Sequence, residues 1–213
     1  MAELSVLGAI KQLRRPVFTT YEVAHYCRRS LSNTIQALNR LAQEKVVVKI
    51  YRGVWGIEFG KERISPYWVI PFLLPNHRAY LSFVSALHLY GIIEQIPQVV
   101  TVASTSHTRL IKTRLGVFAI HRIHPLFFKG FDWYNKDGMF LIAKPEKAFV
   151  DCLYLSVRKK KQFGYFPELH LPRNFSFKKV IRWANEIPSL KIRKAVFKKI
   201  EEYSSQLRLS SQL

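Results

Sequence analysis

The chain contains few acidic residues and few cysteines, and both shortages limit the classes of function that it can have. Its 213 residues include 14 Asp and Glu against 34 Lys and Arg, a formal net charge of +20. A folded chain this basic usually binds a polyanion, such as DNA, RNA or an anionic membrane surface. Cys27 and Cys152 are too few and too far apart for a disulfide framework or a zinc site. We therefore expect a reducing, cytoplasmic setting.

Long apolar runs are also missing. No stretch reaches the roughly eighteen uncharged apolar residues that a transmembrane helix needs. The first residues lack the basic and apolar regions of a signal peptide, so we expect no membrane partner. The chain is nevertheless 48% hydrophobic, which suffices for one large domain or two small ones.

Catalytic and cofactor-binding motifs are absent as well. No Asp-x-Asp pair is present to hold the metal of a nucleotidyltransferase, and no glycine-rich phosphate loop occurs. A metal-dependent nuclease needs clustered carboxylates, whereas Glu146 stands beside Lys147 and the two point in different directions on a helix. His121 and His124 would face opposite ways on a strand, which makes metal chelation poor. We expect no enzyme activity, no metal site and no cofactor.

Residues 1–60 carry the pattern of three helices followed by a β-hairpin. The predicted helices span residues 4–13, 21–26 and about 30–44, and the predicted strands span residues 46–50 and 54–57. Pro16 ends the first helix, and Thr19 and Thr20 are good caps for the second. Residues 27–29 form the turn, and Ser30 or Ser32 caps the third helix.

The third predicted helix has an apolar face and a polar face. We expect an inward stripe formed by Leu31, Ile35, Leu38 and Leu41 with Ala42. The opposite face carries residue types that can hydrogen-bond base edges and phosphates. The candidate DNA-binding residues are therefore Arg28 and Arg29 before the helix, Ser32, Asn33, Gln36 and Arg40 on it, and Lys49 and Arg52 at or near the hairpin tip.

This order of elements is that of a winged helix-turn-helix, in which the third helix enters the major groove and the hairpin is the wing. It predicts sequence-specific binding of double-stranded DNA. A module that binds RNA or protein is the alternative. Readers of single-stranded RNA display aromatic stacking platforms, whereas the aromatic residues of this chain lie mostly in apolar runs.

The polar stretch 58–66 contains Gly60 and Pro66 and predicts a boundary between domains 1–60 and 66–213. The second domain is expected to be α+β. We expect helices over residues 83–90 (capped by Ser82), from about 143, over 176–186 and over 189–207, and strands over residues 97–103, 116–123 and 139–142.

Most of the positive charge lies in this second part. Residues 61–213 hold 25 basic and 10 acidic side chains, a net of +15, against +5 for residues 1–60. We expect the second domain to touch the DNA backbone too. The candidates are Arg158, Lys159, Lys160 and Lys161, with Lys178, Lys179 and Arg182. A basic face that meets an acidic partner is the alternative.

Two stretches of the second domain resemble the AbiEi family of antitoxin-type regulators. They are residues 80–97 (YLSFVSALHLYGIIEQIP) and residues 142–151 (IAKPEKAFVD), the second close to the family form A-x-P-E-K-A-hydrophobic-hydrophobic-D. With the winged N-terminus, the resemblance covers most of residues 19–155. The last sixty residues match none of the family's motifs.

The resemblance implies an antitoxin of a bacterial abortive-infection operon, encoded beside a nucleotidyltransferase-like toxin. It implies a repressor that binds inverted repeats in its own promoter. It also implies a C-terminal domain that serves both antitoxin activity and cooperative repression. Other members of the family are transcriptional regulators without an assigned toxin.

Overall fold

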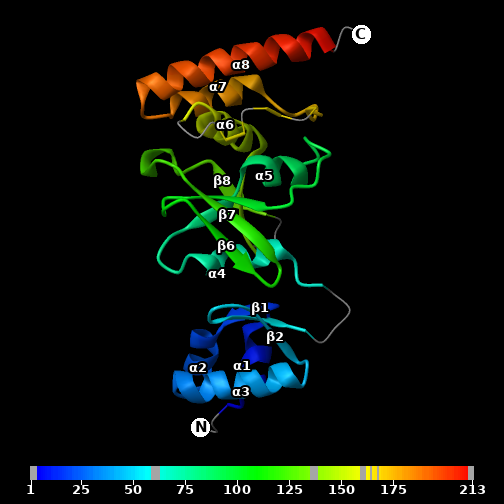
Figure 1. Ribbon diagram of the computed structural model, residues 1–213, viewed down its shortest axis with the longest axis vertical. Helices are drawn as coiled ribbons and strands as arrows, with labels where there is room; N and C mark the ends of the chain where they lie inside the picture. Colours follow the sequence, from blue (N-terminus) through cyan, green and yellow to red (C-terminus); the bar gives the residue numbers. More distant parts are fainter. Residues whose placement is uncertain are drawn as a thin grey trace. The chain divides into compact units, whose positions relative to one another are not determined.

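The computed structural model describes residues 4–58, 63–134, 139–158, 162–163, 165–166 and 168–210. The fold is α+β, as the sequence predicts, with helices and two sheets (Figure 1). The chain divides into two compact units. Unit 1 comprises Met1–Asn76 with Ile111–Val117, and unit 2 comprises His77–Leu110 with Phe118–Leu213.

Unit 1 begins with three helices and a small antiparallel sheet. Its elements are α1 (Val6–Leu13), β1 (Val17–Thr19), α2 (Thr20–Cys27), α3 (Leu31–Gln43), β2 (Val47–Tyr51) and β3 (Val54–Ile57). The sheet has the strand order β1-β3-β2. The helices pack on one face of it around a core that includes Phe18, Val23, Leu38 and Trp55 (Figure 1). A 3-10 helix, η1 (Pro66–Val69), and the short α4 (Ile70–Leu73) follow.

Unit 2 contains most of a six-stranded sheet with the order β6-β7-β5-β4-β9-β8, of which Ile111–Val117, in β6 and β7, belong to unit 1. Its strands are β4 (Ala79–Leu81), β5 (Val100–Ser104), β6 (Arg109–Thr113), β7 (Gly116–Arg122), β8 (Phe131–Trp133) and β9 (Leu141–Ala143). Its helices are α5 (Phe83–Leu89), η2 (Pro125–Phe127), α6 (Pro145–Ser156), α7 (Phe177–Asn185) and α8 (Leu190–Ser210). In Figure 1, α6 lies between the sheet and the pair α7 and α8.

The short strands depart most from the sequence prediction. β1, β4 and β8 have three residues each, and none was expected. Each exists because a partner strand pairs with it: β1 with β3, β4 with β5 and β9, and β8 with β9. Three residues are too few to show an alternating pattern, so their sequence carries no strand signal of its own.

Candidate nucleic-acid interface

Local capping bonds fix the start of α2. The Thr19 hydroxyl accepts a hydrogen bond from the Glu22 backbone N–H at 3.2 Å, and the Glu22 carboxylate accepts one from the Thr19 N–H at 2.8 Å. This capping box satisfies two backbone donors that a helix start leaves open. The Arg15 guanidinium also pairs with Glu22. Partial burial raises the pKa of Glu22, but Arg15 and Thr19 outweigh it and hold this pKa below its usual value.

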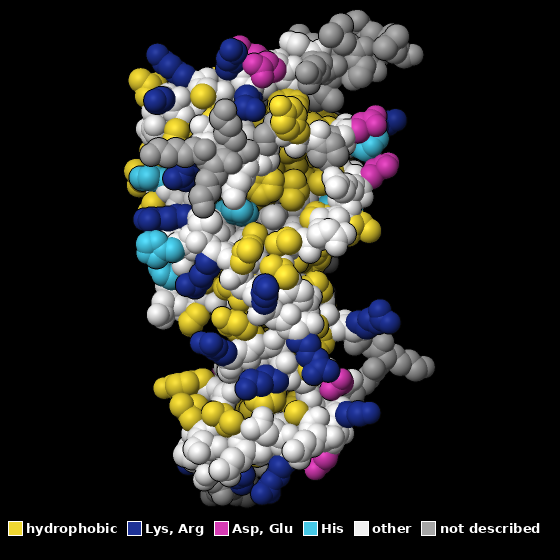
Figure 2. Space-filling model, viewed as in Figure 1, with side chains coloured by type: hydrophobic (Ala, Val, Ile, Leu, Met, Phe, Trp, Pro, Cys, Tyr) yellow, Lys and Arg dark blue, Asp and Glu magenta, His cyan; other side chains and the backbone are white. Residues whose placement is uncertain are grey.

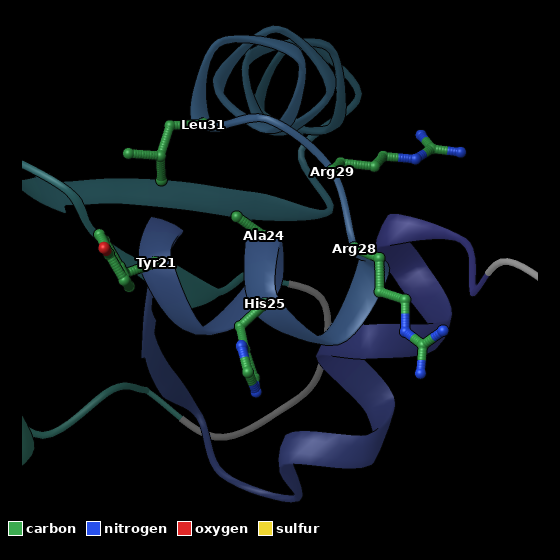
Figure 3. Close-up of a pocket in the computed structure, with 6 residues that line it drawn as sticks. All are labelled: Tyr21, Ala24, His25, Arg28, Arg29 and Leu31. Atoms are coloured by element: carbon green, nitrogen blue, oxygen red, sulfur yellow. The ribbon is translucent and has the colours of Figure 1, made fainter.

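A tight turn at Arg28 and Arg29 joins α2 to α3, as predicted, whereas Cys27, which was also expected in the turn, is the last residue of α2. Arg28 adopts the left-handed conformation (φ 54°), and its N–H returns to the carbonyls at the end of α2. The Arg29 N–H donates to the Ala24 carbonyl at 3.1 Å, which closes the turn. The Arg28 and Arg29 side chains are exposed and extend away from the turn (Figure 3).

Ser30 is the N-cap of α3. Its hydroxyl accepts the Asn33 backbone N–H at 3.2 Å, so the helix begins at Leu31. Of the two cap candidates, the structure therefore selects Ser30 and places Ser32 within the first turn of the helix, where its side chain is exposed.

The inward face of α3 differs from the predicted stripe. Leu38 and Thr34 are fully buried, whereas Leu31 and Ile35 are 44% and 41% exposed. A buried threonine is tolerated because its hydroxyl donates to the Ser30 carbonyl at 2.9 Å. Leu41 and Ala42 are partly buried against the core, as predicted. The prediction was therefore wrong for Leu31 and Ile35, because it placed every apolar residue inside and every polar one outside.

Four predicted DNA-binding residues lie together. Arg29, Asn33, Gln36 and Arg40 line one surface depression of about 450 Å³, between α1 and α3. All four side chains are exposed. Glu44, at the end of α3, also lines it and is the acidic residue of the set. This depression lies on the side of α3 away from Leu38. Gln36 precedes Leu38 by two residues and Arg40 follows it by two, and each step is a rotation of about 200° around the helix.

A second depression of about 470 Å³ lies between α2 and the start of α3. It is lined by Tyr21, Ala24, His25, Arg28, Arg29 and Leu31 (Figure 3). Arg29, in the α2–α3 turn, lines both depressions. Tyr21 and His25 were not among the predicted contacts. Both are exposed residues of α2, a helix whose sequence was interpreted only for its inward side.

The β2–β3 hairpin presents one predicted cation at its turn and one along its strand. Arg52 is exposed beside Gly53, whose φ of 69° suits the two-residue turn. The Gly53 carbonyl accepts the Thr20 N–H at 2.9 Å, which holds the turn against the start of α2. Lys49 lies within β2, and its ammonium stands 5.7 Å from the centre of the Trp55 ring. Lys49 is therefore further from the tip than Arg52.

The turn between β6 and β7 lies against the same hairpin, which the sequence did not predict. The Arg114 backbone N–H donates to the Ile50 carbonyl of β2 at 3.1 Å. Both residues belong to unit 1. No local signal could have revealed this contact, because it joins backbone atoms more than sixty positions apart.

The predicted backbone contacts of unit 2 are only partly described. Arg158 is exposed, but its guanidinium donates to the Arg122 carbonyl at 3.2 Å and lies 5.3 Å from the centre of the Tyr154 ring. Lys159, Lys160 and Lys161 lie outside the described residues. Lys178, Lys179 and Arg182 are exposed on α7, and Lys179 pairs with Glu146 at 3.3 Å. Figure 2 shows Lys and Arg side chains over the surface of each unit.

The K-P-E-K-A motif of unit 2 forms a buried network. Lys147 and Asp151, one helical turn apart on α6, are an ion pair with no exposed side-chain surface. The Tyr80 and Ser82 hydroxyls donate to Asp151 at 3.1 and 2.8 Å. Burial lowers the pKa of Lys147 and raises that of Asp151, and their pairing opposes both shifts. Burial and the neighbouring Asp151 raise the pKa of Tyr80 well above its usual value.

Two residues of this region have roles other than those expected. Ser82 precedes α5, but its side chain does not cap the helix. Its hydroxyl donates a hydrogen bond to the Asp151 carboxylate instead. Glu146 accepts the Ser176 N–H at 3.2 Å and the Lys179 ammonium, so it ties α6 to the start of α7. Asp151 pairs with the Lys147 ammonium.

Within the described residues, no group of three or more His, Cys, Asp or Glu could hold a metal ion. Cys27 and Cys152 are both buried core residues. His121 and His124 have different structural roles: His121 is buried in β7, and His124 caps η2. None of the described helices is both long enough and apolar enough to span a bilayer.

No protein-family model and no curated protein matches this chain.

Proposed function

We propose that the chain binds double-stranded DNA through unit 1, which acts as a winged helix-turn-helix with α3 in the major groove. The observation that carries the proposal is the grouping of Arg29, Asn33, Gln36 and Arg40 along one exposed side of α3. The thirteen residues of α3 form a rod about 20 Å long. The major groove, about 12 Å wide, admits such a helix.

The chemistry of each group fits a different part of the duplex. Asn33 and Gln36 carry amides that can bond adenine at two positions, and Arg40 carries a guanidinium that can do the same with guanine. Arg28 and Arg29 stand at the start of α3, where free backbone N–H groups and the helix dipole also favour a phosphate. Arg52, and Lys49 behind it, would meet the phosphates beside the groove.

The direct test is selection of duplexes from a randomised pool, followed by binding measurements on the selected sequence. We expect Gln36→Ala with Arg40→Ala to lower affinity at least about ten-fold and to relax the sequence preference, since each lost base contact costs about 1–3 kcal/mol. Gln95→Ala with Arg173→Ala is the matched control, because both side chains are exposed in unit 2. Equal affinity of the two double variants would refute the assignment of α3.

We extend the proposal to a promoter-binding repressor that resembles the AbiEi antitoxins, acts in the cytoplasm on inverted repeats and has a nucleotidyltransferase-like toxin as its functional partner. The support is the resemblance of residues 80–97 and 142–151. A plain transcriptional regulator without a toxin is the rival. If a neighbouring gene encodes such a toxin, co-expression of the chain should relieve its growth inhibition; without relief, the plain regulator is favoured.

The remaining rival is a nucleic-acid-binding subunit that acts on RNA or assists a nuclease. A competition assay separates it from the proposal. Duplex DNA of the selected sequence should displace a labelled duplex, whereas single-stranded RNA of equal length should not. Equal displacement by the two would favour the RNA-binding alternative.

A further inference from the structure

The turn between β6 and β7 brings two further cations to the wing of the proposed DNA-binding unit. Lys112 is near the end of β6 and Arg114 is in the turn, and both side chains are exposed. The Arg114 backbone N–H donates to the Ile50 carbonyl at 3.1 Å. Since Ile50 belongs to β2, this bond places the turn directly beside a wing strand.

The contact is made at a position where β2 can accept it. β2 is an edge strand of the sheet, because the order is β1-β3-β2. The pairing of β2 with β3 shifts register between Lys49 and Tyr51, so Ile50 is skipped in the ladder. An irregularity of this kind leaves a backbone group without its usual partner strand. The Ile50 carbonyl instead accepts a hydrogen bond from the Arg114 backbone N–H.

The turn has a defined shape of its own. The Thr113 hydroxyl donates to the Gly116 carbonyl at 3.0 Å and accepts the Leu115 N–H at 3.1 Å. These two bonds close the turn around Arg114. The Arg114 and Lys112 side chains are therefore carried on a backbone that is fixed at both sides, by Thr113 and by Ile50.

The charge of this surface has one sign. Residues 46–57 and 111–117 together contain Lys49, Arg52, Lys112 and Arg114 and no acidic side chain. A solvated basic face would be expected to include acidic residues that offset repulsion, as α8 does with Glu201 and Glu202. Four cations on the hairpin and on the adjoining β6 end and turn suit a phosphate backbone, which is a regular row of negative charges.

We propose that Lys112 and Arg114 form a second basic loop that extends the wing and contacts the phosphate backbone of duplex DNA. The inference rests on the proposed function, since it concerns the same ligand. These contacts would add affinity without sequence preference, in contrast to those of Gln36 and Arg40.

The test measures the binding of the full chain to a duplex of mixed sequence over a range of salt concentrations. We expect Lys112→Gln with Arg114→Gln to lower the slope of log affinity against log salt by about 2, since each lost phosphate contact removes about 0.9. Affinity at moderate salt should fall on the order of ten-fold. Lys112→Arg with Arg114→Lys should keep nearly the wild-type slope, because phosphate needs only the charge at these positions.

The matched control is Lys194→Gln with Lys198→Gln, two exposed cations on α8. The inference is overturned if Lys112→Gln with Arg114→Gln changes the slope no more than this control does. Thermal unfolding of each variant checks that the loss is not one of folding.

The outcome separates the two proposals. If the wild type binds and Gln36→Ala with Arg40→Ala abolishes sequence preference, the proposed function stands whatever the β6–β7 turn does. If the wild type binds no duplex, both proposals fail together. A uniform loss over all sequences for Lys112→Gln with Arg114→Gln supports the second basic loop.

Discussion

Polar residues stand at the surface along α3 of unit 1 and are enclosed around α6 of unit 2. Asn33, Gln36 and Arg40 are exposed around an open depression. In unit 2, Lys147 and Asp151 are fully buried, with the hydroxyls of Tyr80 and Ser82 turned toward them. An exposed polar group keeps its hydration and is available to a ligand, whereas a buried one must find its partners within the protein. The difference separates residues suited to binding from residues that hold the fold.

The comparison predicts that substitutions in the two places change different measurements. Removing the exposed polar residues of α3 should alter binding and leave stability nearly unchanged. Removing a member of the buried network should alter stability first. Four experiments sharpen this contrast, beginning with the largest expected effect.

Lys147→Met should destabilise unit 2 by about 3–5 kcal/mol, because it leaves the Asp151 carboxylate buried without its cation. Lys178→Met, which removes an exposed lysine of α7, is the control and should cost about 1 kcal/mol or less. Urea denaturation measures both. Lys147→Met combined with Asp151→Leu should recover much of the loss, since no unpaired charge remains. A Lys147→Met protein as stable as the Lys178→Met protein would contradict the role of the network.

Acid should weaken unit 2 through His121. This ring packs between Phe83 and Phe163, with ring centres 5.0 and 5.3 Å away. Burial lowers its pKa from 6.5 to about 4, and the nearby Gln162 opposes the shift only in part. The unfolded chain therefore binds more protons between pH 6.5 and 4. The stability from His121 is complete above pH 6.5 and is lost as the pH falls toward 4, up to about 3 kcal/mol.

The measurement is urea denaturation of the wild type and of His121→Phe over this pH range. The free-energy difference between them should change steadily from pH 6.5 to 4 and stay constant above it. Glu22 of unit 1 also loses a stabilising contribution in acid, but only below its usual pKa of 4.5. A constant difference between wild type and His121→Phe at all pH values would show that His121 does not titrate in this way.

Arg28→Gln with Arg29→Gln should reduce DNA affinity on the order of ten-fold and the salt slope by about 2, without changing sequence preference. The reason is that both side chains extend from the turn at the start of α3, where a phosphate is expected (Figure 3). Lys194→Gln with Lys198→Gln again serves as the control of equal charge change. A changed sequence preference would instead make these arginines base-reading residues.

The smallest expected effect concerns the apolar residues of α3. Leu31→Ala should cost less than about 1 kcal/mol of stability, because the side chain is 44% exposed. Leu38→Ala, on the same helix but fully buried, should cost about 2–5 kcal/mol. Thermal or urea unfolding compares the two. Equal costs would mean that Leu31 is as buried as the sequence pattern suggested.

The sequence by itself determined the first three helices and the β-hairpin of unit 1, and helices α5 to α8 with strands β5, β7 and β9 of unit 2. The Thr19 cap, the turn at Arg28 and Arg29 and the Ser30 cap all act within a few positions along the chain. Pro145 likewise begins α6, because its missing N–H costs nothing at a helix start. Such signals are local in sequence, so a single sequence suffices to find them. The polar side of α3, with Asn33, Gln36 and Arg40, followed from the same helical period.

Only the tertiary structure decided which of these residues are enclosed and which strands pair. Ser82 has the sequence of a helix cap, yet its hydroxyl bonds Asp151, 69 positions away. Leu31 and Ile35 fit the pattern of an inward stripe, yet the residues of α3 that are buried are Thr34 and Leu38. β1, β4 and β8 are strands only through their partners. The bond from Arg114 to Ile50 is of the same kind. Burial and pairing depend on residues far apart in the chain, and no local pattern records them.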